Sequence, residues 1–251
     1  MKTNIVINWD CLDAMKQIPD KSIDCIITSP PYWKWFAYEA YFNSYKQYLD
    51  WTKDWLKECK RILKLDWTLY LNVINDSEIT IRAFEIMEIA TRDIMYKLHD
   101  TIIWYRYNQQ PANTTRQLTN QCEYIFMLRH TSAGILLDKK SAYENYPEMF
   151  KTKNVWNVWE LPFNSWKEKN NFGKKETESK WGHSGFPVKL PETCILLSTK
   201  EWDLVLDMFA WSGTTWVACK NTNRNYILIE KDPDYCKIIE KRLKNTNPPL
   251  F

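Results

Sequence analysis

The chain has 251 residues, a length that fits one domain or one domain with an inserted lobe. Hydrophobic residues make up 45% and aromatic residues 15% of the chain, which excludes disorder as its main state. No apolar run approaches the ~18 residues that a membrane helix needs, and no signal peptide is expected. The net charge of +3 permits a nucleic-acid partner without demanding one.

Strands and helices are expected to alternate over the first half of the chain. Apolar residues recur at helical spacing over 45–64 and over Ile79–Tyr96, which predicts two amphipathic helices. Short apolar runs predict the strands Ile23–Thr28, Thr68–Val73, Thr101–Tyr105 and Tyr124–Leu128. This alternation predicts an α/β fold with a parallel, doubly wound sheet.

The second half breaks this pattern and then returns to it. Residues 130–187 are rich in Lys, Asn, Ser and Trp, which predicts an inserted lobe or a long functional loop. The elements expected after it are the helix Leu190–Ser198, the strand Asp203–Asp207, a helix from Thr214, the strand Tyr226–Glu230 and the helix Asp234–Leu243.

The first buried strand runs into Thr28-Ser29-Pro30-Pro31-Tyr32. Two prolines fix the backbone and remove two N–H donors, so carbonyl acceptors, the Ser29 hydroxyl and the Tyr32 ring are left to face a ligand. This set suits a planar ring that carries an amino group. A tight turn at the end of a strand, with a packed tyrosine, explains the same residues.

Two later strands end in acidic residues. Asp207 precedes a loop of small residues that leads into a helix, which is where doubly wound folds bind nucleotide-like cofactors. Glu230 ends the next strand and is placed to accept hydrogen bonds from ribose hydroxyls. For Glu230, a solvated acidic turn would give the same pattern.

The seven cysteines are scattered, without a C-x-x-C pair and without a histidine at metal spacing. They are expected to be free thiols, packed as small hydrophobic side chains in a protein of the reducing cytoplasm. No metal site is expected.

Together the three segments resemble the DNA amino-methyltransferases, which methylate cytosine N4 or adenine N6 with S-adenosylmethionine. The resemblance covers nearly the whole chain, and the motif order is that of the circularly permuted subgroup. It departs from the family at Met208 and Trp211. It implies the catalytic residues Ser29, Pro30, Pro31 and Tyr32, and the cofactor-binding residues Asp10, Phe186, Asp207, Phe209, Ser212, Gly213, Thr214 and Glu230.

The resemblance implies a seven-stranded sheet with helices on both faces. Residues 1–129 would form the catalytic half, 130–187 the target-recognition region and 188–251 the cofactor-binding half. Trp156, Trp159 and Trp166 are expected either to pack this lobe or to enter the gap left by a flipped base. Lysines that could hold phosphates of double-stranded DNA are Lys153, Lys167, Lys169, Lys174, Lys175 and Lys180. For each lysine taken singly, a position on a solvated face explains the residue better.

The implied reaction takes place on a base that has flipped out of the duplex and stacks on Tyr32. Serine before Pro-Pro-Tyr favours cytosine N4, and adenine N6 is the alternative. Two further alternatives are a relative that kept the fold and lost catalysis, and an enzyme acting on RNA or on a protein glutamine. Both monomers and homodimers occur in the family, so the oligomeric state stays open, as does a cognate restriction endonuclease.

Glycine is scarce and tryptophan abundant, with 5 and 14 residues respectively, although glycine usually makes up about 7% of a protein. Trp211 stands in the cofactor loop, where positive φ or close backbone approach is expected, and Trp9 and Trp67 are expected at turn positions of the same kind. We hypothesise that one codon was read as tryptophan that the source organism reads as glycine. The rival hypothesis is that the tryptophans are real and cofactor binding is lost. The positions where the family most often has glycine are Trp9, Trp67, Trp202, Trp211 and Trp216.

Overall fold

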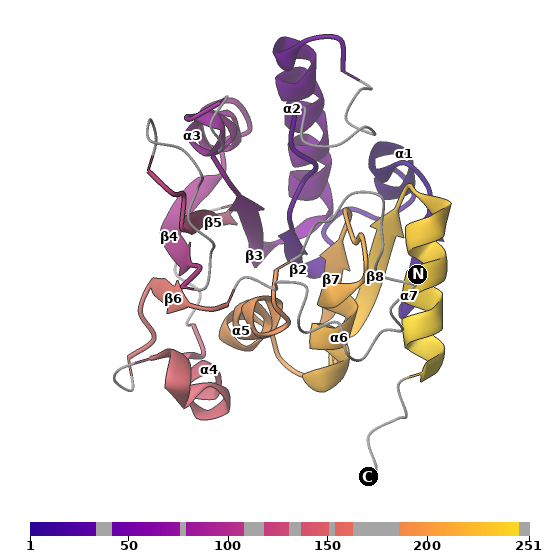
Figure 1. Cartoon of the computed structure of the whole chain (residues 1–251). Helices are drawn as coiled ribbons and strands as arrows, with labels where there is room; N and C mark the ends of the chain where they lie inside the picture. Colours follow the sequence, from indigo (N-terminus) through magenta and orange to yellow (C-terminus); the bar gives the residue numbers. More distant parts are fainter. Residues whose placement is uncertain are drawn as a thin grey trace.

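The computed structural model describes residues 1–33, 42–75, 79–107, 118–130, 137–150, 154–162 and 186–245 (Figure 1). Its strands form one sheet in the order β1-β8-β7-β2-β3-β5-β4-β6. The expected α/β fold is confirmed, with eight strands in place of the expected seven. The strands are β1 (Ile5–Asn8), β2 (Ile23–Thr28), β3 (Leu63–Val73), β4 (Lys97–Tyr105), β5 (Cys122–Arg129), β6 (Val158–Glu160), β7 (Leu204–Asp207) and β8 (Asn225–Glu230).

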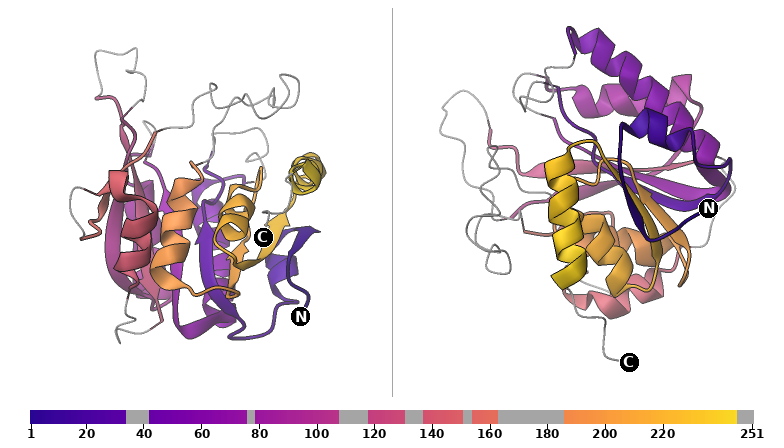
Figure 2. Two further views of the ribbon diagram at one scale, coloured as in Figure 1. Left: turned by 90° about the horizontal axis from the view of Figure 1, so that it is seen from below. Right: turned by 90° about the vertical axis from the view of Figure 1, so that its right-hand side faces the viewer.

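Helices cover both faces of the sheet, as Figure 2 shows, with α1 to α3 on one face and α4 to α7 on the other. Each face has its own apolar cluster, because successive residues of a strand point to opposite faces. The helices are α1 (Cys11–Met15), α2 (Tyr45–Ile62), α3 (Arg82–Glu88), the π-helical turn η2 (Ile89–Asp93), α4 (Lys139–Asn145), the 3₁₀ turn η3 (Pro147–Met149), α5 (Lys189–Ser198), α6 (Thr214–Asn221) and α7 (Pro233–Asn245).

Helix α2 agrees with its predicted bounds to within two residues at its end. The Ser44 side chain accepts from the amide of Gln47 and caps the first turn. Trp55, Leu56 and Cys59 are buried on the face that packs against the sheet. Strong helical periodicity and a capping residue explain why this helix can be predicted from the sequence.

The helix expected over Ile79–Tyr96 is shorter in the structure, where α3 begins at Arg82 and widens into η2. The Thr91 hydroxyl donates to the carbonyl of Met87, which competes with the regular helical bond of that turn. Met95 then has a left-handed φ of 61° and ends the helical segment. The spacing of apolar residues alone predicts neither the Thr91 hydrogen bond nor the left-handed backbone of Met95.

Strand β2 lies between β7 and β3 and runs parallel to both, with Cys25 opposite Val205 on one side and Thr68 on the other. From β2 the chain moves to β3 in one direction, and from β7 it moves to β8 in the opposite direction. The gap between the carboxyl ends of β2 and β7 is therefore a topological switch point. In sheets of this kind ligands bind at such a point. Strand β5 departs from the parallel expectation, since it is antiparallel to β3 and β4.

The described part of the predicted target-recognition region packs against the main sheet. Strand β6 pairs with β4, and α4 lies against α5. Trp159 is fully buried and its indole N–H donates to the carbonyl of Trp156, so Trp159 packs the core and does not enter a base gap. Trp156 is half exposed. The lysines predicted to hold phosphates and Trp166 lie outside the described residues.

The seven cysteines are all free, and six of them are buried, as expected for thiols that act as small hydrophobic side chains. Burial raises the pKa of the Cys25 thiol to about 12. Within the described ranges, no helix combines the length and the apolar character needed to span a membrane.

Candidate active site

The residues before the Pro-Pro pair are fixed by the sheet. All six residues of β2 are buried, and its last residue, Thr28, donates through its hydroxyl to Oδ1 of Asp207 at 2.9 Å. The hydroxyls of Ser29 and Tyr32 lie 2.8 Å apart and share a hydrogen bond. The predicted catalytic loop therefore leaves the sheet at the switch point, with its two hydroxyls together.

Asp207 ends β7 and is 2% exposed. Besides Thr28, it accepts from the Thr215 hydroxyl at 2.5 Å and from the Phe209 amide at 3.1 Å. Burial raises the pKa of the Asp207 carboxyl to about 6, because the charged form loses its hydration. Asp207 thus braces the cofactor loop and the first turn of α6 from inside the protein. Its predicted contact with a cofactor stays a prediction.

Phe209 lies next to this brace and packs against α2. Its ring centroid is 5.5 Å from that of Trp51 and 5.6 Å from that of Trp55, the latter edge to face. Helix α2, one of the strongest sequence signals, therefore supports the loop after β7. The ring remains partly exposed.

Gly213 begins α6 with a left-handed φ of 80°. A Cβ atom at this position would lie 3.1 Å from Cγ1 of Ile239, so both the backbone and the space favour glycine. The carbonyl of Ser212 accepts from the guanidinium of Arg242, and the predicted residue Thr214 is the first residue of α6. The loop is held between α6 and α7.

Trp211 has a left-handed φ of 45°, in keeping with the expectation for its loop. Its amide donates to Oε2 of Glu230 at 2.8 Å, and its indole packs on Tyr235 with ring centroids 5.6 Å apart. The other oxygen of Glu230 accepts from the Asp232 amide at 2.8 Å. The hydrogen bond from the Trp211 amide to the Glu230 carboxylate therefore joins the two predicted cofactor elements.

Of the other tryptophans at predicted glycine positions, Trp202 also has a left-handed φ, of 71°. Trp9, Trp67 and Trp216 do not. Trp67 lies within strand β3 and Trp216 within helix α6, so the expectation that Trp67 occupies a turn is wrong. Its place within a strand gives Trp67 a backbone that does not require glycine.

Asp10 caps α1 by accepting from the Leu12 amide at 3.0 Å, and it forms an ion pair with Lys231 at 3.2 Å. Because the amide of Trp9 donates to the carbonyl of Glu230, Asp10 lies near the end of β8. Phe186 is buried in the cluster beneath α5, on the face of the sheet opposite to that of Phe209. The predicted contacts of Asp10 and Phe186 with a cofactor stay predictions.

Charged side chains that the sequence did not single out lie beside Tyr32. Glu123 is buried and pairs with Arg106, with 3.2 Å between Oε1 and Nη1. Burial raises the pKa of Glu123, and burial together with the charge of Glu123 raises the pKa of Tyr32, which therefore stays protonated. Arg82 lies over the Tyr32 ring. No periodicity or motif marks these residues, because their proximity arises from strands far apart in sequence.

Across the part of the chain that the structure describes, no group of three or more His, Cys, Asp or Glu side chains could hold a metal ion.

A family model described as DNA methylase, of the N6/N4 methyltransferase type, matches residues 23–241. The chain is 29% identical over 266 residues to the Type II methyltransferase M.HinfI of Haemophilus influenzae, which covers 98% of the chain and 69% of that protein. It is 28% identical over 273 residues to the Type II methyltransferase M.Cfr9I of Citrobacter freundii, which covers 94% of the chain and 86% of that protein.

Solved structures have the same fold. PvuII DNA methyltransferase, described as cytosine-N4-specific, matches with a TM-score of 0.78 and 19% identity, over 100% of the chain and 89% of that structure. M1.HpyAVI in its SAM complex matches with a TM-score of 0.65 and 22% identity, over 96% and 98%. Since the family model spans most of the sequence, the chain belongs to the DNA methylase family of N6/N4 methyltransferases.

Proposed function

We propose that this chain transfers a methyl group from S-adenosylmethionine to the exocyclic amine of a flipped base in double-stranded DNA, with cytosine N4 as the favoured target. The observation that carries the proposal is the meeting of two loops at the switch point. The Ser29–Tyr32 loop and the loop after Asp207 leave adjacent parallel strands, and the Thr28–Asp207 hydrogen bond ties them together.

The residues after β7 and β8 fit the cofactor in part. Each Glu230 oxygen accepts one hydrogen bond from a main-chain amide of the described residues, so each keeps a lone pair for a ribose hydroxyl. Phe209 offers a partly exposed ring, and Asp10 lies close by. Trp211 is the departure from the family motif, since a large indole that packs on Tyr235 stands in the cofactor loop where the family most often has glycine. When bound, S-adenosylmethionine supplies an electrophilic methyl group on a sulfonium.

The chain's own residues would position the amine for methyl transfer. The Tyr32 ring stacks on the flipped base. A Ser29 hydroxyl that donates to Tyr32 keeps its own lone pairs to accept a hydrogen bond from the amine, and the Pro30 carbonyl accepts a hydrogen bond from the second amine hydrogen. Hydrogen bonds to these acceptors shift electron density onto the amine nitrogen. Orientation and electrostatics then supply most of the rate.

Cytosine N4 is favoured because Ser29 occupies the position before Pro-Pro-Tyr. The alternative is adenine N6, since a serine hydroxyl accepts from either amine. The designation of both curated relatives as Type II methyltransferases supports a role in restriction–modification, with a cognate restriction endonuclease as partner. We further propose that residues 130–187 read the target sequence, between a catalytic half over 1–129 and a cofactor-binding half over 188–251.

A second candidate function is DNA binding without catalysis. The observation in its favour is the left-handed Trp211, whose indole packs on Tyr235 in the cofactor loop. A chain of this kind would keep the fold and the base platform while binding little cofactor.

Transfer of a tritiated methyl group to duplex DNA, RNA and protein tests the proposal, with nucleoside mass spectrometry to identify the product. We expect N4-methyldeoxycytidine in duplex DNA from the Trp211→Gly chain, and none from the same chain carrying Tyr32→Ala. N6-methyldeoxyadenosine would move the target to adenine. Label in RNA or protein alone would contradict the proposal, and DNA binding without label would favour the second candidate.

A further inference from the structure

Arg82 lies under the predicted catalytic loop although it comes from a different part of the chain. It is the first residue of α3 and is 0% exposed. Its Cζ atom lies over the Tyr32 ring, 5.7 Å from the ring centroid, and its Nη2 donates to the carbonyl of Trp33 at 3.2 Å. One guanidinium thus contacts two successive residues of the loop.

The start of α3 is itself fixed at the carboxyl edge of the sheet. The amide of Ala83 donates to Oδ1 of Asn75, two residues beyond the end of β3, at 2.7 Å. Glu85 accepts from the hydroxyl of Tyr45 on α2 at 2.6 Å. The backbone that carries Arg82 is therefore tied to β3 and α2, and both are parts of the rigid core.

The loop needs support of this kind. Pro30 and Pro31 have no N–H to donate, so this segment can form few main-chain bonds of its own. A donor from Arg82 to Trp33 supplies one at its far end. The cation also attracts the face of the Tyr32 ring, and this attraction is stronger at a buried site than in water.

We propose that Arg82 is a positioning residue for the base platform, by which we mean the Tyr32 ring on which the flipped base stacks. It covers one face of the Tyr32 ring and holds the Trp33 carbonyl, so that a flipped base can stack only on the other face. This inference rests on the proposed function for its consequence in catalysis, whereas the support of the loop can be measured without any activity.

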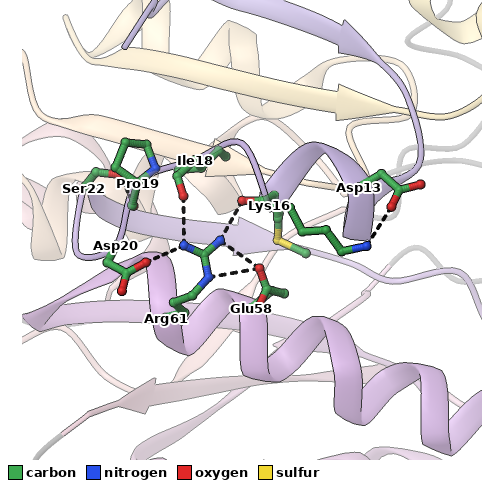
Figure 3. A network of polar contacts seen from close by, with 9 residues as sticks. Asp13, Lys16, Ile18, Pro19, Asp20, Ser22, Glu58 and Arg61 are labelled. Atoms are coloured by element: carbon green, nitrogen blue, oxygen red, sulfur yellow. Dashed lines mark hydrogen bonds and ion pairs between the residues drawn. The ribbon is translucent and has the colours of Figure 1, made fainter.

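The test compares Arg82→Met, Arg82→Lys and the matched control Arg61→Met in the full chain. Arg61 holds another loop in the same manner, at the opposite edge of the sheet, by donating to the carbonyls of Met15 and Ile18. Figure 3 shows its guanidinium between Ile18, Asp20 and Glu58. The hydrogen bonds of Arg61 go to Met15, Ile18, Asp20 and Glu58 and to none of residues 28–33, so the control removes an arginine that holds a different loop through more hydrogen bonds.

Hydrogen–deuterium exchange is read on peptides that cover 24–33, 13–22 and 204–215. The prolines carry no amide hydrogen, so within the loop the exchange signal of the first peptide comes from Ser29, Tyr32 and Trp33, and the rest comes from β2. We expect Arg82→Met to speed exchange in 24–33 roughly tenfold, because a charged donor is lost, and to leave 204–215 unchanged. Arg61→Met should speed exchange in 13–22 only.

Arg82→Lys keeps the charge but cannot both cover the ring and donate in the same geometry, so an intermediate effect is expected. If Arg82→Met fails to fold, the exchange rate of peptide 24–33 in Arg82→Lys decides whether Arg82 holds the loop. Exchange in 24–33 equal to that of the unaltered chain in every folded Arg82 variant would overturn the proposal. So would equal acceleration in all three peptides, which indicates general destabilisation.

The catalytic consequence is measured on the Trp211→Gly background as kcat and as KM for each substrate. We expect kcat for DNA to fall about tenfold in Arg82→Met while KM for S-adenosylmethionine is unchanged. Unchanged kcat together with a loosened loop would overturn the positioning role. If no variant, including the Trp211→Gly parent, methylates DNA, the proposed function fails while the exchange data still decide whether Arg82 holds the loop.

Discussion

The hydroxyl of Thr28 donates to Oδ1 of Asp207 at 2.9 Å, and this bond joins the last residues of two adjacent parallel strands. The Ser-Pro-Pro-Tyr loop follows Thr28 directly, and the predicted cofactor loop follows Asp207 directly. The bond therefore fixes the relative position of the two loops that a methyl transfer reaction would have to bring together.

Replacing Thr28 by Val removes this donor and preserves the side-chain shape. The variant is expected to lose about 1.5–3 kcal/mol of unfolding free energy, because a buried carboxylate loses a hydrogen bond. Thr52→Val is the matched control, since its buried hydroxyl has no partner among the described residues. Urea denaturation should show no loss for Thr52→Val. Equal losses in both variants would contradict the assignment.

The pH dependence of stability reports on Asp207. Burial raises the pKa of its carboxyl from 3.8 to about 6 in the folded chain, so folding favours the protonated form. Between about pH 4 and 6 the folded chain binds more protons at this site than the unfolded chain, and the free energy of unfolding falls as the pH rises.

Asp207→Asn removes this titration. We expect the unfolding free energy of the unaltered chain, minus that of the variant, to fall by about 2.5 kcal/mol from pH 4 to pH 7. Denaturant titrations at a series of pH values measure this difference. A difference that is constant with pH would show that the Asp207 carboxyl titrates normally.

Trp202→Gly is expected to stabilise the protein. The side chain is 71% exposed and so contributes little burial, while its backbone has a left-handed φ of 71°. Relief of this strain outweighs the entropy that glycine adds to the unfolded chain, for a net gain of about 1 kcal/mol. The control is Trp9→Gly, which is half exposed and outside the left-handed region, and it should destabilise. A lower denaturation midpoint for Trp202→Gly than for the unaltered chain would contradict the claim that the left-handed backbone of Trp202 costs stability.

Trp211→Gly is expected to create or tighten binding of S-adenosylmethionine, because the change removes the indole that packs on Tyr235 in the cofactor loop and relieves a left-handed φ of 45°. Isothermal titration calorimetry compares it with the unaltered chain, which should bind weakly or not at all. Trp202→Gly, at the opposite end of β7, is the control and should leave the affinity unchanged. Micromolar affinity of the unaltered chain for S-adenosylmethionine would contradict the prediction.

The hypothesis of a misread codon has its own measurement. Only two of the five tryptophans at predicted glycine positions have a left-handed φ, and these are Trp202 and Trp211. Peptide mass spectrometry of the protein isolated from its source organism is expected to find glycine at both. Tryptophan at residue 211 would instead support a chain that has lost cofactor binding.

Much of the fold was predictable because its signals are local. The periodicity of α2 and the buried runs of β2 and β7 depend on neighbouring residues only, and their predicted bounds agree closely with the structure. By contrast, β1 and α1 were not predicted, because β1 has no fully buried residue, unlike β7, and the five residues of α1 are too few to establish a helical period. The three-residue edge strand β6 was missed for the same reason.

The sequence by itself identified the Ser29–Tyr32 and Asp207–Thr214 segments as chemically unusual, since prolines, small residues and acids at strand ends are visible in the chain order. Only the tertiary structure showed that Thr28 bonds to Asp207, that Arg82 lies over Tyr32, and that Trp159 belongs to the core. Each of these contacts joins segments tens to nearly two hundred residues apart in the chain or depends on burial, which is decided by packing rather than by any local pattern.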